Sequence, residues 1–340
     1  MLPNKLEISL KMNNIVAAVV VTYNRKDLLL ECLDGLLVQT LAVNKIIVID
    51  NASTDGTKEL LHERGYLENP LIEYVQLIEN TGGSGGFYEG VKRGYEAGYD
   101  WLWLMDDDSE PAPDALELMA EHFNENNLVA LANLKVGEDG IPQYHHTGWF
   151  SICSLGNRVV DPVIQTSLEE NLLEIDFSSF VGILVRASAI SLVGMPKKEF
   201  FIHHDDVEYC LRLIQHGRIL LVPDSKIIHK DQRNKRITAR RVLGRESVRI
   251  ASDSLWIYYY GARNLAWIKS RRCPLYLLGA AVLLARQTVG IMIYDDFKMA
   301  RFKIITHAII NGIFGRFDNE FPLKYKGLGK LNQEKILHRH

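Results

Sequence analysis

The sequence has few cysteines, and none of them is spaced like a metal or redox motif. Its 340 residues contain four, which lie far apart and form no C-x-x-C pair: Cys32, Cys153, Cys210 and Cys273. Zinc sites and disulfide frameworks are usually announced by close, regular cysteine spacing. We therefore expect neither a zinc site nor a disulfide framework, and we expect the chain to work in a reducing cytoplasm.

Export and membrane-spanning signals are also missing. Residues 1–14 are polar, with only two lysines and no apolar stretch, so they do not read as a signal peptide. The apolar stretch from Leu275 to Tyr294 is interrupted by Arg286 and Gln287. Its unbroken apolar run is shorter than the roughly 20 residues that cross a bilayer. We expect this stretch to form an interfacial or buried helix.

Two enzyme signatures are absent as well. No G-x-S-x-G motif occurs, which argues against a hydrolase with a nucleophile elbow. The glycine-rich segment Asn80 to Phe87 (NTGGSGGF) is not followed by Gly-Lys-Ser/Thr, so it is not a Walker motif. It is either a backbone cradle for an anion at the start of a helix around Tyr88 to Gly98, or a flexible connector.

A small total charge hides two oppositely charged parts. The chain carries a formal net charge of −3. Residues 1–229 hold 17 Lys+Arg and 34 Asp+Glu, a net −17, whereas residues 230–340 hold 22 and 8, a net +14. We expect the basic part to meet an anionic partner, with lipid headgroups, diphosphates and nucleic acid as candidates, unless it is simply a solvated face.

The first half alternates between strands and helices. Ile15 to Thr22 and Lys45 to Asp50 are apolar and rich in β-branched residues, and Asp27 to Thr40 between them has helical spacing. Further strands are expected at 72–77, 101–105 and 128–134. The pattern predicts a doubly wound α/β domain with a mostly parallel sheet, whose ligand lies beyond the carboxyl ends of the strands.

Polar motifs follow three of these expected strands. Thr22 to Arg25 follows the first, Asp50 to Gly56 the second, and Asp106-Asp107-Asp108 the strand WLWLM. Three adjacent carboxylates require a compensating positive charge, and Mg²⁺ or Mn²⁺ prefers such oxygen ligands. The alternative is an acidic cap on the helix that begins near Pro113.

A second acidic cluster lies within Phe200 to Glu208 (FFIHHDDVE), before a helical stretch from Tyr209 to His216. One of its carboxylates has the chemistry of a general base, although an acidic helix N-terminus explains the same pattern. His229 follows the strand 219–222 and a turn at Pro223-Asp224. It is either a packing residue or a nitrogen ligand that Mn²⁺ accepts.

Together these motifs resemble glycosyltransferase family 2, whose members have a nucleotide-binding GT-A domain and invert the anomeric centre. The matching elements are VVVTYNR, VIDNASTDGT, NTGGSGGF, LMDDD, FVGILVRASAI, FFIHHDDVEYCLRL and His229. The combination is most similar to bacterial galactofuranosyltransferases and rhamnosyltransferases. It implies an N-terminal extension (1–14), a GT-A catalytic domain (15–230) and a basic, mainly helical C-terminal region (231–340).

The resemblance also implies residue roles. Asp206 matches the family's catalytic base, and Asp205 stands where many relatives have glutamate, so its role is less defined. Mn²⁺ or Mg²⁺ would be held by Asp106, Asp108 and His229. The nucleotide-sugar would be bound by Thr22, Tyr23, Arg25, Asp50, Asn51, Asn80, Gly83, Ser84, Asp106 and Asp107.

From the resemblance we expect an inverting, metal-dependent transferase that uses UDP-galactofuranose in cell-surface polysaccharide synthesis. A rhamnosyltransferase using dTDP-rhamnose and an inactive carbohydrate-binding descendant are the alternatives. The basic C-terminal region, in which YYGARN (259–264) resembles an element of these transferases, suits a polyprenyl-diphosphate-linked glycan acceptor. We expect the protein to be cytoplasmic and peripheral on the inner face of an anionic membrane. We expect no nucleic acid partner, and a homo-oligomer is left open.

Overall fold

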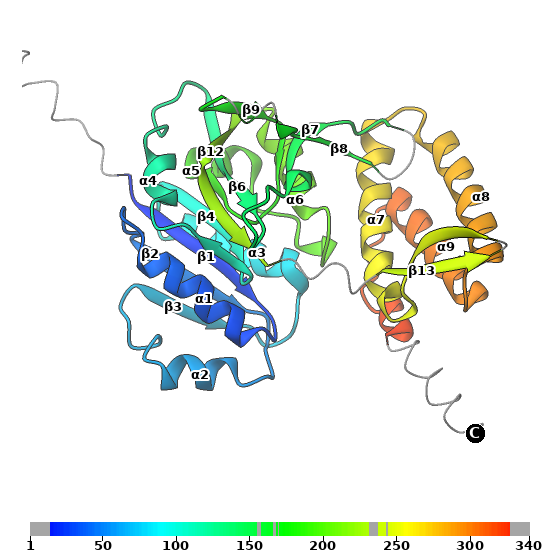
Figure 1. Ribbon diagram of the computed structural model, residues 1–340, viewed down its shortest axis with the longest axis horizontal. Coiled ribbons are helices and arrows are strands. Elements are labelled where there is room, and N and C mark those ends of the chain that lie inside the picture. Colours follow the sequence, from blue (N-terminus) through cyan, green and yellow to red (C-terminus); the bar gives the residue numbers. More distant parts are fainter. Residues whose placement is uncertain are drawn as a thin grey trace, which may run out of the picture.

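The structure is a computed structural model that describes residues 14–154, 158–165, 168, 170–230, 237–242 and 244–326. Its larger part is an α/β unit built on one twisted sheet, and three long C-terminal helices stand beside that unit (Figure 1). The expected N-terminal extension lies almost entirely outside the described residues.

Four parallel strands form the first half of the sheet, in the order β3-β2-β1-β4. They are β1 (Val16–Thr22), β2 (Lys45–Asp50), β3 (Ile72–Gln76) and β4 (Trp101–Asp106). The helices between them are α1 (Lys26–Leu37), α2 (Thr57–Glu63) and α3 (Gly82–Glu96). The predicted strands and the doubly wound connection are confirmed.

The second half of the sheet is mixed. β11 (Ile183–Arg186) runs antiparallel between β4 and β6 (Leu128–Val136), and β12 (Arg218–His229) runs parallel to β6. The edge strands β5 (Ser109–Pro111) and β9 (Leu173–Ile175) pair antiparallel with β12. The helices of this half are α4 (Ala115–Ala120), α5 (Ala187–Val193), the short 3₁₀ turn Lys198–Phe200 and α6 (Asp205–Leu213).

Burial on both faces explains the continuous apolar run of β1. Val19 and Val21 belong to one core cluster, and Ala18 and Val20 to the cluster on the other face. Successive side chains of a strand point to opposite faces, so a strand sandwiched between helices needs apolar residues at every position. The sheet is therefore the rigid base on which the polar loops at its carboxyl edge stand.

The glycine-rich segment differs from the prediction, because α3 begins at Gly82 rather than near Tyr88. Gly86, Gly90 and Gly94 recur every four residues on one face of this helix. A Cβ atom at these positions would overlap Val21, Val19 and Leu102, respectively. The glycines therefore let α3 lie directly on the sheet, and most of the run is a helix surface rather than a loop.

The segment before His229 also differs from the prediction. Instead of a turn at Pro223-Asp224, β12 continues through it to His229, with a register shift between Val222 and Lys226. A bulge accommodates the proline, whose missing N–H cannot join a regular ladder. This continuation pairs His229 with Ser109 and so brings it next to the triple aspartate.

A small second sheet carries an unexpected disulfide. It consists of β7 (Thr147–Phe150), β8 (Val160–Pro162) and β10 (Phe177–Ser178), preceded by a 3₁₀ turn at Tyr144–His146. Cys153, just after β7, is bonded to Cys273, with Cα atoms 5.4 Å apart. The expectation of no disulfide is wrong for this pair, because cysteines 120 residues apart give no spacing signal. Cys32 and Cys210 are free and buried.

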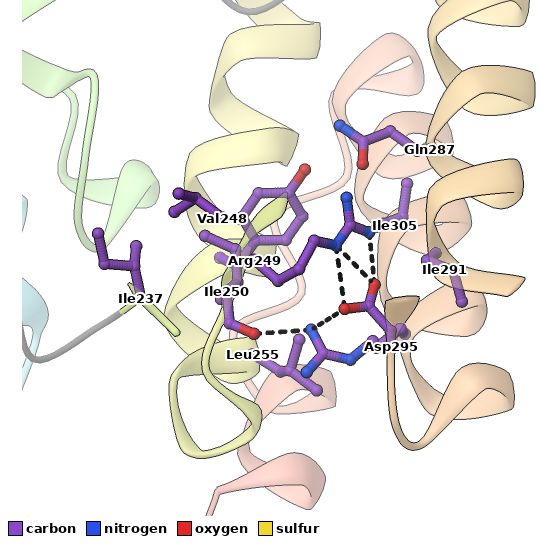
Figure 2. Close-up of a pocket in the computed structure, with 11 residues that line it drawn as sticks. Ile237, Val248, Arg249, Ile250, Leu255, Gln287, Ile291, Asp295 and Ile305 are labelled. Carbon is purple, nitrogen blue, oxygen red and sulfur yellow. Dashed lines mark hydrogen bonds and ion pairs between the residues drawn. The ribbon is translucent and has the colours of Figure 1, made fainter. Parts of the chain in front are cut away.

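The C-terminal region is mainly helical, as expected. After a 3₁₀ turn at Ser252–Ser254 come α7 (Leu255–Arg272), α8 (Tyr276–Tyr294), α9 (Lys298–Phe314) and a last 3₁₀ turn at Phe321–Tyr325. A hairpin of β13 (Ile237–Val242) and β14 (Arg245–Ile250) precedes them. Asp295 holds the hairpin, because it pairs with Arg249 and lies 3.8 Å from Arg301, beside a cavity of about 210 Å³ (Figure 2).

Helix α8 is exposed over one whole side, so it is not the buried helix that the sequence left open. Its inner face packs on α9 through Ala280 and Ile291. On the outer side, Leu278 and Val282 are each 70% exposed, and Val289 and Met292 each 58%. By length and composition alone, this helix could also cross a membrane, despite Arg286. It is the one helix of the described residues that meets this criterion.

Candidate active site

The candidate site lies where the order of the sheet reverses. The chain leaves β1 toward β2 on one side and returns to β4 on the other, so the connections diverge beyond the carboxyl ends of β1 and β4. Thr22 ends β1, and Asp106 ends β4. The predicted polar motifs therefore meet at the edge where ligands of open α/β sheets bind.

Arg25 supplies much of the positive charge for the triple aspartate. Its Nη1 lies 3.1 Å from Asp107 Oδ1 and 2.7 Å from Asp108 Oδ2. Thr22 Oγ1 donates to Asp107 Oδ2 at 2.7 Å. Burial raises the pKa of Asp107 to about 6, and Arg25 and Thr22 oppose this shift. Two residues expected at the nucleotide are therefore bonded to the acidic cluster.

Asp108 and His229 face each other in a buried position. His229 Nε2 lies 3.5 Å from Asp108 Oδ1, and that oxygen has no hydrogen-bond partner among the described residues. The Gln143 amide nitrogen donates to the His229 carbonyl at 3.0 Å, and its Oε1 accepts from His229 Nδ1 at 2.7 Å. Nδ1 of His229 thus donates to Gln143, and Nε2 is the ring nitrogen that faces the carboxylate oxygen.

This arrangement fits a cation between the two side chains. Two acceptors facing each other repel unless a metal or a proton lies between them, and metal-bound histidines usually donate their other N–H to a second partner. Asp106 is not part of the pair: in the described part of the chain, no three His, Cys, Asp or Glu side chains converge as a metal cluster. The predicted three-residue ligand set is thus brought together only at Asp108 and His229. Sequence reasoning missed Gln143.

The residues after β2 are buried and bonded within the protein. Asp50 accepts hydrogen bonds from Ser53 N at 2.7 Å and from the Tyr74 hydroxyl. Asn51 donates to the Gly82 carbonyl at 2.8 Å and accepts from Thr81 Oγ1 at 2.9 Å. Asn51 therefore fixes the entry to α3, and Asp50 ties the turn after β2 to β3.

The other residues expected at the nucleotide lie nearer the surface or at the start of α3. Tyr23 is 40% exposed. Asn80 is exposed, and its Oδ1 accepts from Gly82 N at 2.8 Å, which leads the chain into the helix. Gly83 has open space where a Cβ would stand, whereas Ser84 is buried. An open backbone at a helix N-terminus is suited to an anion.

The second acidic cluster forms the N-terminus of α6. Asp205 is buried and Asp206 half-buried, both in the first turn. Burial raises the pKa of Asp205 to about 6, whereas the adjacent Ser84 hydroxyl acts to lower it. Burial, followed by the charge of Asp205, raises the pKa of Asp206 to about 7. Asp206 is thus a carboxylate that changes its charge near neutral pH.

Lys135 lies in the core behind this pair and was missed by sequence reasoning. Its side chain is almost fully buried on β6, and Nζ donates to Ser178 Oγ at 2.5 Å. Burial lowers the pKa of Lys135 to about 7, and the lysine and Asp206 each favour the charge of the other. The sequence signal that could have identified Lys135 is a lysine at an inward-facing position of the apolar strand ANLKV.

The backbone before α6 is strained. Phe201, His203 and His204 have φ angles of 64°, 69° and 62°, in the left-handed region. Non-glycine residues held in sparsely populated regions cost of order 1–3 kcal/mol each and persist only where surrounding contacts fix them. Ser84 N donates to the Phe201 carbonyl at 3.1 Å, which joins the start of α3 to this turn.

Sequence comparisons identify relatives of this chain. The sequence model of glycosyl transferase family 2 matches residues 17–182. Galactofuranosyltransferase GlfT1 of Mycolicibacterium smegmatis is 30% identical over 209 residues, which are 60% of this chain and 66% of that protein. GlfT1 of Mycobacterium tuberculosis H37Rv is 32% identical over 221 residues, 61% and 66% of the two chains. The matches thus cover just under two thirds of these relatives' length.

A third relative matches over more of its length. The dTDP-rhamnosyl transferase RfbF of Shigella flexneri is 23% identical over 316 residues, 89% of this chain and 97% of that protein. In fold, the chain resembles a crystal structure of GalNAc-T7 with UDP, GalNAc and Mn²⁺ (TM-score 0.59, 14% identity, 88% of this chain and 56% of that one). It also resembles Staphylococcus aureus TarS 1–349 in complex with UDP (TM-score 0.53, 15% identity, 92% and 88%). Residues 17–182 therefore form a glycosyl transferase family 2 domain.

Proposed function

We propose that the protein is an inverting, metal-dependent glycosyltransferase that takes a sugar from a nucleotide diphosphate. The observation that carries this proposal is the buried pair of Asp108 and His229, in which Nε2 faces a carboxylate oxygen that has no hydrogen-bond partner among the described residues. A family 2 match spans the aspartate, and the fold neighbours were solved with UDP, one of them with Mn²⁺ as well.

Asp108 and His229 would hold Mn²⁺ or Mg²⁺, with Asp106 near enough to add negative charge. Such ions bind through one or two carboxylates and complete their shell with water and substrate phosphates. When bound, the ion offsets the charge that grows on the leaving diphosphate. Arg25, now paired with Asp107 and Asp108, is the side chain of this cluster that can turn toward a phosphate.

Asp206 would take the proton from the acceptor hydroxyl. A general base works best when its pKa is close to the operating pH, and that of Asp206 is raised to about 7. Asp205 is more deeply buried, beside Ser84, and would help to set that pKa. A single displacement on the face opposite the leaving group inverts the anomeric centre and needs no covalent nucleophile.

The donor would lie across the carboxyl edge of the sheet and the start of α3. Tyr23, Gly83 and Asn80 are the exposed or open parts of this surface. Asp50 and Asn51 would act from the end of β2, Thr22 from the end of β1 and Asp107 from just after β4. The residues proposed for the nucleotide-sugar are Thr22, Tyr23, Arg25, Asp50, Asn51, Asn80, Gly83, Ser84, Asp106 and Asp107.

We propose UDP-galactofuranose as the donor, because the 30–32% identical relatives are named galactofuranosyltransferases. dTDP-rhamnose is the second candidate, since RfbF matches over 89% of this chain. The test is nucleotide diphosphate release from a panel of nucleotide sugars, with Mn²⁺ and with chelator. Release from no donor in the presence of an acceptor lipid would favour an inactive carbohydrate-binding descendant.

We propose further that the C-terminal region, taken as residues 231–340, docks on an anionic membrane at the inner face of the cell membrane. Residues 237–326 contain 15 Lys and Arg and 6 Asp and Glu, a net +9, and Arg263, Lys269 and Arg301 among them are buried. The outer side of α8 adds the exposed apolar side chains Leu278, Val282 and Val289 to this basic region. Because α9 covers the inner face of α8, the helix has one side for lipid, as an interfacial helix does. A lipid-linked glycan acceptor would meet the enzyme there.

A further inference from the structure

Helix α7 of the C-terminal region forms hydrogen bonds with the turn that leads into the acidic helix α6. Asn264 is fully buried, and its amide nitrogen lies 2.9 Å from the Phe200 carbonyl, 3.0 Å from that of Ile202 and 2.8 Å from that of His203. One amide NH₂ has two protons, so the three carbonyls share them and at least one of the hydrogen bonds is bifurcated. Their positions fix the path of the chain between Phe200 and Asp205.

Arg263 orients this amide. Its Nε donates to Asn264 Oδ1 at 3.0 Å, which turns the NH₂ group toward the carbonyls. Its Nη2 donates to the carbonyls of Glu199 and Phe200 at 3.1 and 2.9 Å. Its Nη1 donates to Asn319 Oδ1 at 2.8 Å, and the guanidinium is fully buried.

This turn is strained, and the start of α3 contacts it from the side opposite α7. Phe201 and His203 adopt positive φ angles, which relax unless contacts enforce them. Phe201 stacks on Tyr260 of α7, with ring centroids 4.6 Å apart. On the other side, a Cβ at Gly82 would overlap the Phe201 carbonyl, so only glycine lets the start of α3 approach this turn.

We propose that Asn264, oriented by Arg263, is a positioning residue for the proposed base: it holds the strained turn 200–204 so that Asp206 stays in line with the acceptor. The proposal rests on the proposed function. It makes a residue of the C-terminal region necessary for proton transfer, although that residue lies on α7 and is not among the residues proposed for the donor or the metal. The geometry around Asn264 itself, however, can be measured without turnover.

The first experiment is amide hydrogen exchange on the full-length protein and on Asn264→Ala. We expect exchange of residues 200–208 to rise at least tenfold, while β1 and β4 keep their protection. Asn311→Ala is the matched control, because Asn311 on α9 bonds the Tyr259 hydroxyl rather than the turn. Equal exchange of 200–208 in Asn264→Ala and in the unmodified protein would overturn the proposal, whether or not a donor has been found.

The second experiment compares steady-state kinetics. Asn264→Ala should lower kcat by about 10² while UDP binding stays within about twofold, and the acid limb of its pH profile should move to lower pH as Asp206 becomes hydrated. If Asn264→Ala does not fold, Asn264→Asp keeps the shape and the bond from Arg263 but loses the donated protons. Unchanged kcat and pH limb in the folded variant would refute the positioning role. Absence of transfer by the unmodified enzyme would instead contradict the proposed function.

Discussion

The chemistry proposed at the carboxyl edge of the sheet depends on single side chains, and the pair of Asp108 and His229 is the most specific part of that proposal. We expect Asp108→Asn to remain folded but to lose Mn²⁺-supported binding of UDP, because the facing oxygen that attracts the cation becomes part of a neutral amide. Titration calorimetry with UDP, with and without Mn²⁺, measures this. Full turnover in excess chelator would contradict the assignment.

Substitution of Asp206 tests the proposed proton transfer. Asp206→Asn is nearly isosteric but cannot accept a proton, so we expect kcat to fall roughly 10²-fold or more with little change in donor affinity. Asp205→Asn is the paired control, since Asp205 lies in the same helical turn and is buried beside Ser84. A larger loss in Asp205→Asn would reverse the two roles.

The pH profile follows from the same carboxylate. Burial and the charge of Asp205 raise the pKa of Asp206 to about 7, above the ordinary value near 4. The base works in its ionised form, so kcat should rise with pH through about 7 and fall about tenfold per unit below it. Lys135 favours the ionised form, and Lys135→Met should therefore move this limb to higher pH. A flat profile between pH 5 and 8 would exclude Asp206 as the base.

Residue roles could be predicted from the sequence only in part. The triple aspartate ends a predicted strand and His229 stands out by type, so the meeting of Asp108 with His229 was predictable, although β12 replaces the turn expected at Pro223-Asp224. Gln143 was not, because it bonds His229 across 86 residues from a loop with no motif. Arg25 was assigned to the nucleotide, but ion pairing with Asp107 and Asp108 depends on how β1 and β4 pair.

At the scale of elements, the outer side of α8 is the feature to test. Leu278→Asp combined with Val282→Asp should reduce binding to anionic vesicles, because both side chains are 70% exposed and would bring charge to the acyl layer. Leu192→Asp on α5 is the matched control, since Leu192 is 63% exposed and far from α8 in the chain. Sedimentation with vesicles measures the binding.

The electrostatic part of membrane binding should weaken with salt, which screens exposed charges over about 8 Å at physiological ionic strength. Charge reversal at Arg241 and Arg245 is the direct test, because both are exposed. Arg240 is a less clean site, since it pairs with Asp296 at 2.6 Å. If vesicle binding is unchanged both in these variants and in the double variant of α8, the basic region is a solvated face or an oligomer contact instead.

Elements with strong periodicity were predictable, and their exceptions have physical causes. β1, β2 and α1 follow from apolar runs and helical spacing. The helical start at Gly82 was obscured by glycines, which disfavour helices on their own but here allow α3 to contact β1. The course of β12 through Pro223 depends on a bulge that only the neighbouring β6 reveals.

At the scale of the whole molecule, the disulfide joins the catalytic half to the end of α7. Under denaturing, non-reducing conditions we expect two reactive thiols, Cys32 and Cys210, and four after reduction. Mass spectrometry after alkylation counts them. Four thiols without reductant would mean that the bond does not form in the purified protein.

Removing that bond frees a segment of 120 residues, for which loop-closure entropy predicts a loss of about 4–5 kcal/mol. Cys153→Ser should therefore melt at a lower temperature than the oxidised protein, and reduced samples of the two should melt alike. This pairing, like the contact of α7 with the turn 200–204, joins parts that are distant in sequence, and no local pattern predicts it.

The contact of Arg263 and Asn264 with that turn bears on how such enzymes can be recombined. A chimera that keeps residues 17–182 and takes the remainder from a relative would retain the donor edge of the sheet but receive both the acidic helix and its holder from one parent. A crossover between residues 209 and 255 would separate them. We expect crossovers before residue 197 to give active hybrids more often than crossovers between residues 209 and 255. On this proposal, the part of the chain that must come from one parent extends to α7 and does not stop at the end of the sheet.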